Sequence, residues 1–186
     1  MSDIIIKDIP LLLKEISEKN SEHAMKILYR NYFNKLLRFV TLYVKSDQAG
    51  EEIIGDVFLE IWQNRASLLE IKNFNAYIFT VSRNKSIDYL RSNKLYFDQL
   101  DENSLDLYSK TETTPEDYLI SKELTNKLNI AIESLPSQCK MAFKLIREDN
   151  LKYKEAAEVL NISVKTLEAH ITKAVKVLRC AITSIA

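Results

Sequence analysis

The stretch 154–178, KEAAEVLNISVKTLEAHITKAVKVL, most constrains the fold, because it has the pattern of two helices joined by a tight turn. Asn161 stands at the turn, where a positive φ is often needed, and Ser163 suits the N-cap of the second helix. In the second helix, apolar residues recur at spacings of three and four: Val164, Leu167, Ile171, Ala174 and Leu178. This pattern is typical of a DNA-binding helix-turn-helix, and an ordinary helical hairpin with a solvated face shares it.

The composition favours helices along the whole chain. Only 2 Gly and 3 Pro occur in 186 residues, and the hydrophobic fraction of 46% is enough for a packed core. No apolar run approaches the roughly 18–20 residues of a membrane span, and the start MSDIIIKDIP lacks the features of a signal peptide. We therefore expect a cytoplasmic, all-α protein. Cys139 and Cys180 lack metal-ligand spacing, so we expect both to be buried free thiols.

The charges divide the chain into segments. The net charge is +0, but residues 98–117 hold seven acidic residues and one basic residue, whereas the segments on either side are basic. This pattern predicts two small helical domains, 1–95 and 116–186, joined by an acidic linker, 96–115. Helical periodicity occurs near 8–18, 21–45, 49–65 and 73–93 in the first domain, and the second is expected to be a four-helix domain with the helix-turn-helix.

A predicted helix at 51–63, EEIIGDVFLEIWQ, has an apolar stripe and an acidic stripe. Glu52, Asp56 and Glu60 recur every four residues, and we expect all three to be without basic partners. Such a stripe indicates either a solvated face or a surface that docks on a basic partner. Trp62, the only tryptophan, stands at the edge of the stripe, as an interface anchor or as a half-buried core residue.

The next predicted helix, about 74–93, has a polar line through its middle, and an aromatic residue flanked by two amides opens it. Asn73, Phe74 and Asn75 form that opening. Bases stack on aromatic rings, amides pair with base edges, and Arg or Lys holds phosphates. The segment therefore suggests a grip on an unstacked base or a melted strand. The polar line and its neighbour are Thr80, Arg83, Asn84, Asp88 and Arg91.

Three segments occur here in one order: EEIIGDVFLEIWQNR, NFNAYIFTVSRNKSIDYLRS, and LPSQCKMAF followed by LKYKEAAEVLNISVKTLEAHITKAVKVLR. Together they resemble the extracytoplasmic-function class of sigma-70 family sigma factors, over residues 20–95 and 116–182. The segment TLEAHITKA resembles the corresponding segment of the iron-citrate-type branch, which is common in Bacteroidetes. The resemblance implies a sigma factor that binds core RNA polymerase and directs promoter-specific transcription initiation.

The resemblance also implies roles for matching positions. The residues expected to contact the clamp helices of the polymerase β′ subunit are Asp56, Glu60, Trp62 and Gln63. Those expected at the −10 element are Asn73, Phe74, Asn75, Arg83, Asn84, Asp88 and Arg91. Those expected in the major groove of the −35 element are Lys165, Thr166, Glu168, Ala169, His170 and Lys173. Further implied partners are the β flap, promoter DNA and a membrane-bound anti-sigma factor, while the linker would run toward the RNA exit path.

Some positions depart from the family pattern. Tyr77 stands where the family usually has Trp, and Lys85 stands where an apolar residue is usual. Asn161 stands where Gly is common, and His170 stands where Arg or Lys is common. The last departure matters most for base reading, since neutral histidine accepts hydrogen bonds as well as donating them. Glu168 could accept from a cytosine amino group or orient a neighbouring lysine.

Two other classes of protein remain as alternatives. The wording KTLEAH also resembles the output domain of response regulators, which bind DNA without being polymerase subunits. Such a protein needs a sensor domain, and the first half lacks the strand–helix alternation of a receiver. An all-helical enzyme is the second alternative, but the chain has no HExxH, HD pair, phosphate loop or nucleophile–His pattern. We therefore expect no catalytic residue, no metal and no cofactor.

Overall fold

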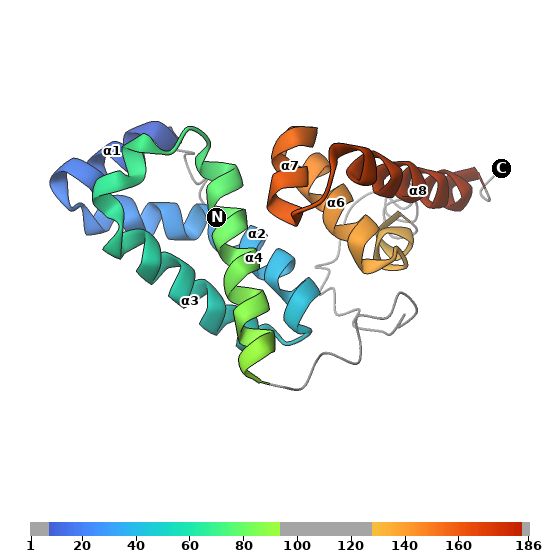
Figure 1. The fold of residues 1–186 in the computed structure, drawn as a ribbon, viewed down its shortest axis with the longest axis horizontal. Coiled ribbons are helices and arrows are strands. Elements are labelled where there is room, and N and C mark those ends of the chain that lie inside the picture. The colour runs from blue at the N-terminus through green and yellow to red at the C-terminus, as the bar shows by residue number, and fades with distance from the viewer. Residues whose placement is uncertain (1–7, 94–127, 184–186) are drawn as a thin grey trace, which may run out of the picture. The chain divides into compact units, whose positions relative to one another are not determined.

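The computed structural model describes residues 8–93 and 128–183, and all regular structure in these two ranges is helical (Figure 1). This confirms the all-α prediction. Contacts between Cα atoms divide the chain into two units, residues 1–95 and 96–186, and each is described below by itself. The predicted acidic linker at 96–115 lies outside the described residues, so its two boundaries with the predicted domains stay predictions.

Within residues 8–93, the first unit contains four α-helices and one 3₁₀ helix. They are α1 (Ile9–Lys19), α2 (Glu22–Val44), α3 (Asp47–Gln63), η1 (Arg65–Glu70) and α4 (Phe74–Ser92). The four α-helices lie within three residues of the predicted ranges. The 3₁₀ helix was not predicted, because so short an element has no apolar periodicity by which to recognise it.

Local hydrogen bonds explain where these helices begin and end. Ser21, Ser46 and Asn73 are N-caps, and each side-chain oxygen accepts from the backbone N–H three residues on, at 3.2, 3.3 and 3.1 Å. Asn20 and Lys45 end α1 and α2 in the left-handed conformation, with φ of 51° and 52°. At both residues the chain changes direction sharply before the next helix begins.

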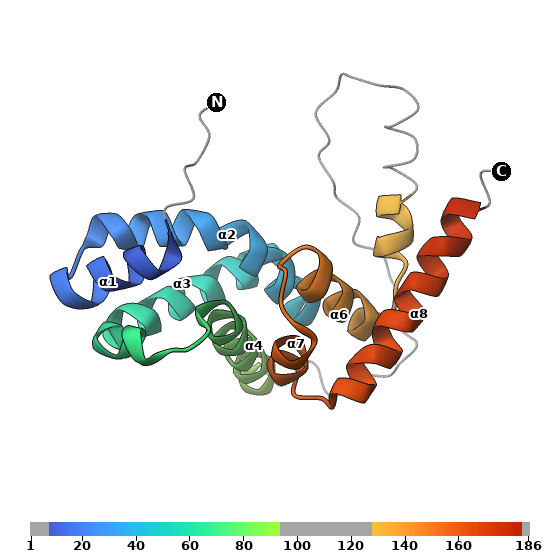
Figure 2. The same cartoon turned by 90° about the horizontal axis from the view of Figure 1, so that it is seen from above.

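The core of the first unit lies where α2 packs against α1, α3 and α4 (Figure 2). Leu36, Ile54 and Phe79 contribute fully buried side chains from α2, α3 and α4. The rings of Phe39 and Phe79 meet edge to face, with centroids 5.1 Å apart. This packing joins three helices around one apolar centre.

Two buried serines let α4 enter this core closely. Ser82 and Ser86 are both 0% exposed. Their hydroxyls donate to the carbonyl oxygens of Ile78 and Ser82, one turn back, at 2.8 and 2.7 Å. Because each hydroxyl has its partner within α4, burial leaves no polar group unsatisfied, and the small side chains leave room for the neighbouring helices.

Within residues 128–183, the second unit contains a helical turn at 128–133, α6 (Ser137–Arg147), α7 (Tyr153–Leu160) and α8 (Val164–Thr183). Helix α6 packs on α7 and α8, and α7 also packs on α8. Leu135, Cys139 and Ala174 form a buried cluster, against which Phe143 and Val177 pack.

The helix-turn-helix prediction is confirmed in its local geometry. Asn161 has φ of 55° and ends α7 in the left-handed conformation. The hydroxyl oxygen of Ser163 accepts from the backbone N–H of Thr166 at 3.0 Å, as expected of an N-cap. Ala156 and Ala157 are buried, so α7 presents small side chains to the core.

The two cysteines differ in environment. Neither forms a disulfide; Cys139 is buried, as predicted, but Cys180 is exposed, so the prediction is wrong for the second. Cys180 follows the buried Leu178 by two positions, which turns it to the opposite side of α8. Among the helices that the structure describes, none is long and apolar enough to cross a membrane.

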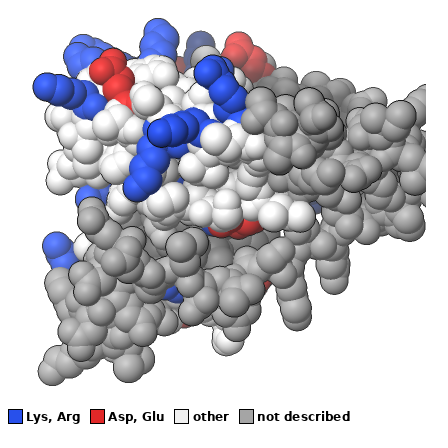
Figure 3. All heavy atoms as spheres, turned by 90° about the vertical axis from the view of Figure 1, so that its right-hand side faces the viewer, with Lys and Arg blue, Asp and Glu red and all other residues white. Residues whose placement is uncertain are grey.

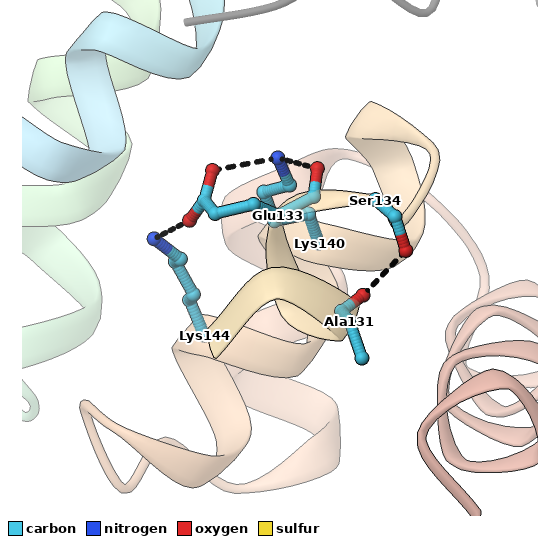
Figure 4. A network of polar contacts seen from close by, with 5 residues as sticks. All are labelled: Ala131, Glu133, Ser134, Lys140 and Lys144. Atoms are coloured by element: carbon cyan, nitrogen blue, oxygen red, sulfur yellow. Dashed lines mark hydrogen bonds and ion pairs between the residues drawn. The ribbon is translucent and has the colours of Figure 1, made fainter. Parts of the chain in front are cut away.

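An ion-pair cluster fixes the helical turn 128–133 on α6 (Figure 4). The Glu133 carboxylate pairs with the Nζ atoms of Lys140 and Lys144, at 3.0 and 3.5 Å. Lys140 also donates to the backbone carbonyl of Glu133 at 2.6 Å. Burial alone raises the pKa of Glu133, but the hydrogen bonds and charges of the two lysines outweigh it and lower the pKa below the ordinary value.

The Glu133 cluster predicts a pH-dependent part of the stability. Because the folded-state pKa lies below the unfolded value, the stabilisation is present above the unfolded pKa and is lost as the pH falls through the folded pKa. Urea unfolding at about pH 7 and about pH 3 should show this loss in the wild type and not in Glu133→Gln. The expected size is at most about 1 kcal/mol, because solvent screens a carboxylate that is 40% exposed. Glu158→Gln, at an exposed position on α7, is the control, and an equal pH effect in Glu133→Gln and wild type would contradict the prediction.

The two glycines of the chain predict opposite responses to alanine. A Cβ at Gly50 would lie 2.9 Å from Leu37 Cδ1 and 3.3 Å from Thr41 Oγ1, whereas one at Gly55 meets nothing within 4 Å. Gly55→Ala should raise the free energy of unfolding by about 0.5–1 kcal/mol through helix propensity. Gly50→Ala should be about 1 kcal/mol less stable than Gly55→Ala, because Leu37 must move. Equal unfolding free energies for the two variants would refute a close contact of α2 and α3 at Gly50.

Candidate nucleic-acid and polymerase interfaces

Helix α8 has one buried face and one polar face. Leu167, Ile171 and Ala174 are buried against the rest of the unit. Five of the six side chains predicted to face the −35 element are exposed: Lys165, Thr166, Glu168, Ala169 and Lys173. His170 is half-buried. The structure therefore places all six on the side of α8 that is open, or partly open, to a ligand.

Two of these side chains have contacts inside the unit. The hydroxyl of Thr166 lies 2.8 Å from that of Ser163, so it takes part in the cap of α8. Nδ1 of His170 lies 3.6 Å from Sγ of Cys139 on α6. A ligand in front of α8 thus meets one histidine whose orientation depends on another helix.

The segment predicted to capture a base opens α4, and its three residues differ in exposure. Asn73 caps the helix, and the Phe74 ring is 6% exposed and meets Tyr32 edge to face, with centroids 5.7 Å apart. Asn75 is exposed, and its Oδ1 accepts a hydrogen bond from the Tyr32 hydroxyl. In this arrangement Phe74 anchors the segment and the two amides border it, so Phe74 offers little ring surface for stacking.

A cavity of about 320 Å³ lies beside this segment. Its apolar wall comes from α1, through Ile9 and Leu13, and from η1, through Leu68. The residues at the start of α4 also line it, among them Asn73 and Asn75. Sequence reasoning missed the contribution of α1, whose periodic apolar residues indicated a core helix but not a hollow beside it.

The polar line of α4 divides into outward and inward side chains. Asn84, Asp88 and Arg91 are exposed, and Asp88 pairs with Arg91 at 3.3 Å. Arg83 is half-buried and hydrogen-bonds to Tyr43 of α2. Burial raises the pKa of Tyr43 to about 12, and the charge and hydrogen bond of Arg83 partly offset that rise. Arg83 thus holds α4 on α2, whereas the other three face solvent.

The acidic stripe of α3 is less uniform than its sequence predicts. Glu52 and Asp56 are exposed, but Glu60 pairs with Lys85 of α4 at 2.9 Å. The prediction of three acids without basic partners is therefore wrong for Glu60, because the partner comes from a neighbouring helix. Tyr77 lies near the same carboxylate: burial raises the pKa of its hydroxyl, and the charge of Glu60 raises it further.

An apolar side chain lies among the polar ones on α3. Leu59 is 54% exposed, although leucine is usually buried. It stands three positions after Asp56 and four before Gln63, which is also exposed, so the three share one side of the helix. Sequence reasoning missed Leu59; its position outside the apolar stripe was the available signal. The face combines an acid, an amide and an apolar centre, which is a usual composition for a protein interface.

The burial of Trp62 agrees with the half-buried interpretation, and its role as an interface anchor stays a prediction. It is half-buried, and the guanidinium of Arg65 lies 4.8 Å from the centre of its ring. Arg65 also donates to the Trp62 carbonyl at 2.9 Å and to Asn20 Oδ1. The Arg65 side chain therefore covers part of Trp62 and links the end of α3 to the end of α1.

The second unit presents a basic surface. Helix α8 carries the basic residues Lys165, Lys173, Lys176 and Arg179. Its only acid is Glu168. On the face drawn in Figure 3, Lys and Arg side chains outnumber acidic ones over the described part of the surface. A local excess of positive charge attracts nucleic acid even though the chain as a whole is neutral.

Both units match known protein families. Residues 28–96 match the model of Sigma-70 region 2, and residues 126–178 match that of Sigma-70, region 4. The first range contains the acidic helix and the base-capture segment, and the second contains the helix-turn-helix. A search of curated proteins finds no match.

Two solved structures share the fold at low sequence identity. CnrH, solved in complex with the cytosolic domain of CnrY, is 16% identical with a TM-score of 0.56, covering 95% of this chain and 98% of that one. The sigma factor RpoE of Bartonella quintana, solved with the anti-sigma factor NepR, is 18% identical with a TM-score of 0.58, covering 85% and 96%.

The basic face of α8 and the paired helical units define a DNA-binding transcription factor, a class without enzymatic activity of its own. More particularly, the chain belongs to the sigma-70 family, and it is a sigma factor that directs transcription by RNA polymerase. A helix-turn-helix regulator that acts without polymerase is not favoured, because the match to region 2 would then have no role.

Proposed function

We propose that this protein is an extracytoplasmic-function sigma factor that holds core polymerase with α3 and reads promoter DNA with both units. The observation that carries the proposal is the match of two regions of one family, each of which contains an exposed face of suitable chemistry. The iron-citrate-type branch is proposed on the TLEAHITKA wording alone. We propose no catalytic residue, metal or cofactor, and a cytoplasmic location beside the polymerase.

For the polymerase contact, we propose the outer side of α3. Asp56 and Gln63 would meet the β′ clamp helices around Leu59, with Trp62 at the edge. An exposed apolar centre within a polar rim excludes water on docking and strengthens the surrounding polar contacts. Glu60 would contribute through its charge while it keeps its pairing with Lys85. The β flap is proposed as a further contact by family resemblance only.

For the −10 element, we propose that the cavity beside α4 takes an unstacked base. Its volume of about 320 Å³ lies at the lower end of the range for small-molecule pockets, about 300–1,000 Å³. Asn73 and Asn75 would meet the polar edge of the base, while Phe74 would support the wall. On α4, the exposed polar line would follow the melted strand: Asn84, Asp88 and Arg91, with Arg83 positioning the helix.

For the −35 element, we propose that α8 enters the major groove with its polar face. Lys165 and Lys173 supply donors and charge, Thr166 and Ala169 fit close to the bases, and Glu168 adds an acceptor. His170 is the remaining base-reading residue. The size of α8 suits this role, since a B-DNA major groove admits one α-helix.

An anti-sigma factor is proposed as the regulatory partner. RpoE was solved with the anti-sigma factor NepR and CnrH with the cytosolic domain of CnrY, and this chain shares their fold. A membrane-bound form of the partner is proposed from the family resemblance.

Transcription with core polymerase tests the proposed function. Adding the full chain should produce run-off transcripts from its own promoters, and Asp56→Lys should weaken binding to core about tenfold or more, because it reverses a charge in the interface. Glu18→Lys makes the same charge change on an exposed position of α1 and should leave core affinity unchanged. Equal core affinities for the two variants would rule out the α3 face.

Promoter binding tests the role of α8. Lys173→Ala should weaken binding to the selected −35 duplex by about 1 kcal/mol and should reduce the slope of log affinity against log salt by about 0.9, as expected for one lost phosphate contact. Lys14→Ala removes an exposed charge from α1 and serves as the control. An unchanged salt slope in Lys173→Ala would exclude that phosphate contact.

A further inference from the structure

His170 is held by a buried thiol from another helix. Its Nδ1 lies 3.6 Å from Sγ of Cys139, a distance within reach of a hydrogen bond that involves sulfur. Cys139 is 2% exposed and packs with Leu135 and Ala174 between α6 and α8. The thiol therefore has a fixed place, and the imidazole edge that carries Nδ1 faces the core.

The chemistry of the two groups decides the direction of this hydrogen bond. A thiol has one weakly acidic proton and a sulfur that accepts poorly, whereas the unprotonated nitrogen of neutral imidazole accepts well. Burial raises the pKa of the Cys139 thiol, and the nearby charge of Lys173 only partly offsets this, so the sulfur keeps its proton at neutral pH. The arrangement with S–H donating to Nδ1 is the favourable one.

We propose that Cys139 is a positioning residue for promoter reading: its thiol donates to Nδ1 of His170, keeps the ring proton on Nε2, and so presents His170 to the major groove as a donor. The two ring nitrogens lie on different edges of the imidazole. With Nδ1 toward Cys139, the Nε2 edge of the ring is turned away from that thiol, and His170 as a whole is half-buried. The inference about base reading rests on the proposed function of α8.

The tautomer determines which bases His170 can contact. In the major groove guanine offers N7 and O6 as acceptors, adenine offers N7 and thymine offers O4, whereas cytosine offers only its amino donor. A histidine with its proton on Nε2 can therefore donate a hydrogen bond to any of the first three bases and disfavours cytosine. Without the thiol, either nitrogen can carry the proton, and the ring can meet a donor or an acceptor.

Nitrogen NMR of the full chain tests the tautomer directly. The sequence contains only two histidines, so His23, which is exposed on α2, is an internal reference for a ring in water. Spectra that connect ring protons to both nitrogens are recorded at about pH 9, well above the ordinary histidine pKa of about 6.5. We expect His170 to show the proton on Nε2 more completely than His23 does.

Variants at position 139 separate the hydrogen bond from packing. Cys139→Ser keeps a donor and should keep the His170 nitrogen shifts, whereas Cys139→Ala removes the donor and should bring them to those of His23. Circular dichroism confirms that each variant is folded, and the serine variant alone suffices if the alanine variant does not fold. A proton on Nδ1 in the wild type, or His170 shifts equal to those of His23, would overturn the inference.

Duplex selection then tests the consequence for base reading. Holoenzyme that contains the full chain selects from duplexes with randomised −35 positions. In the wild type and Cys139→Ser, cytosine should be depleted several-fold at one position, and in Cys139→Ala and His170→Ala that depletion should be lost. Equal depletion in wild type and Cys139→Ala would overturn the role of Cys139. No enrichment of any duplex by the wild type would instead refute the proposed function of α8, while the NMR result still decides the tautomer.

Discussion

The packing of α2, α3 and α4 on one another fixes what the first unit presents to a partner. Burial of Ile53, Val57 and Ile61 holds α3 in one rotation about its axis. Each residue advances the helix by about 100° around its axis. If the buried stripe were shifted by one position, Asp56 and Leu59 would therefore turn together away from their present exposed side. The exposed face of α3 is therefore a consequence of the core.

Some polar residues of the predicted interfaces are bound to partners inside the first unit, and others face solvent. The sequence alone does not distinguish the two groups. Glu60, Asn73 and Arg83 each have a partner within the first unit, in Lys85, the backbone of α4 and Tyr43. A ligand that engages them must replace or share these contacts, which lowers the net gain. This cost is smaller for Asn84 on the outer face of α4, whose Oδ1 accepts only a long hydrogen bond from Arg83, at 3.4 Å. The polar line of α4 thus contains both residues that stabilise the fold and residues that are open to a ligand.

Sequence patterns predicted the local features and missed the non-local ones. Helix positions, the caps at Ser163 and Asn161, and the buried face of α8 depend on neighbours within a turn or two, which periodicity reports. The pairing of Glu60 with Lys85 and the cavity beside α4 join residues from different helices. Their positions depend on packing angles that no single segment encodes. The family resemblance supplied roles for residues but not their contacts.

The same distinction explains why the histidine on α8 depends on α6. An arginine or lysine at that position would be always charged and would donate whatever its surroundings. Neutral imidazole has one donor and one acceptor that exchange places between tautomers, so a neighbouring group must choose between them. In this fold the neighbouring group is Cys139. It lies at the contact between α6 and α8, where the small side chain of Ala174 leaves room for it. Under the proposed role of His170, part of the base-reading chemistry therefore lies in the core of the second unit and not on the surface of α8.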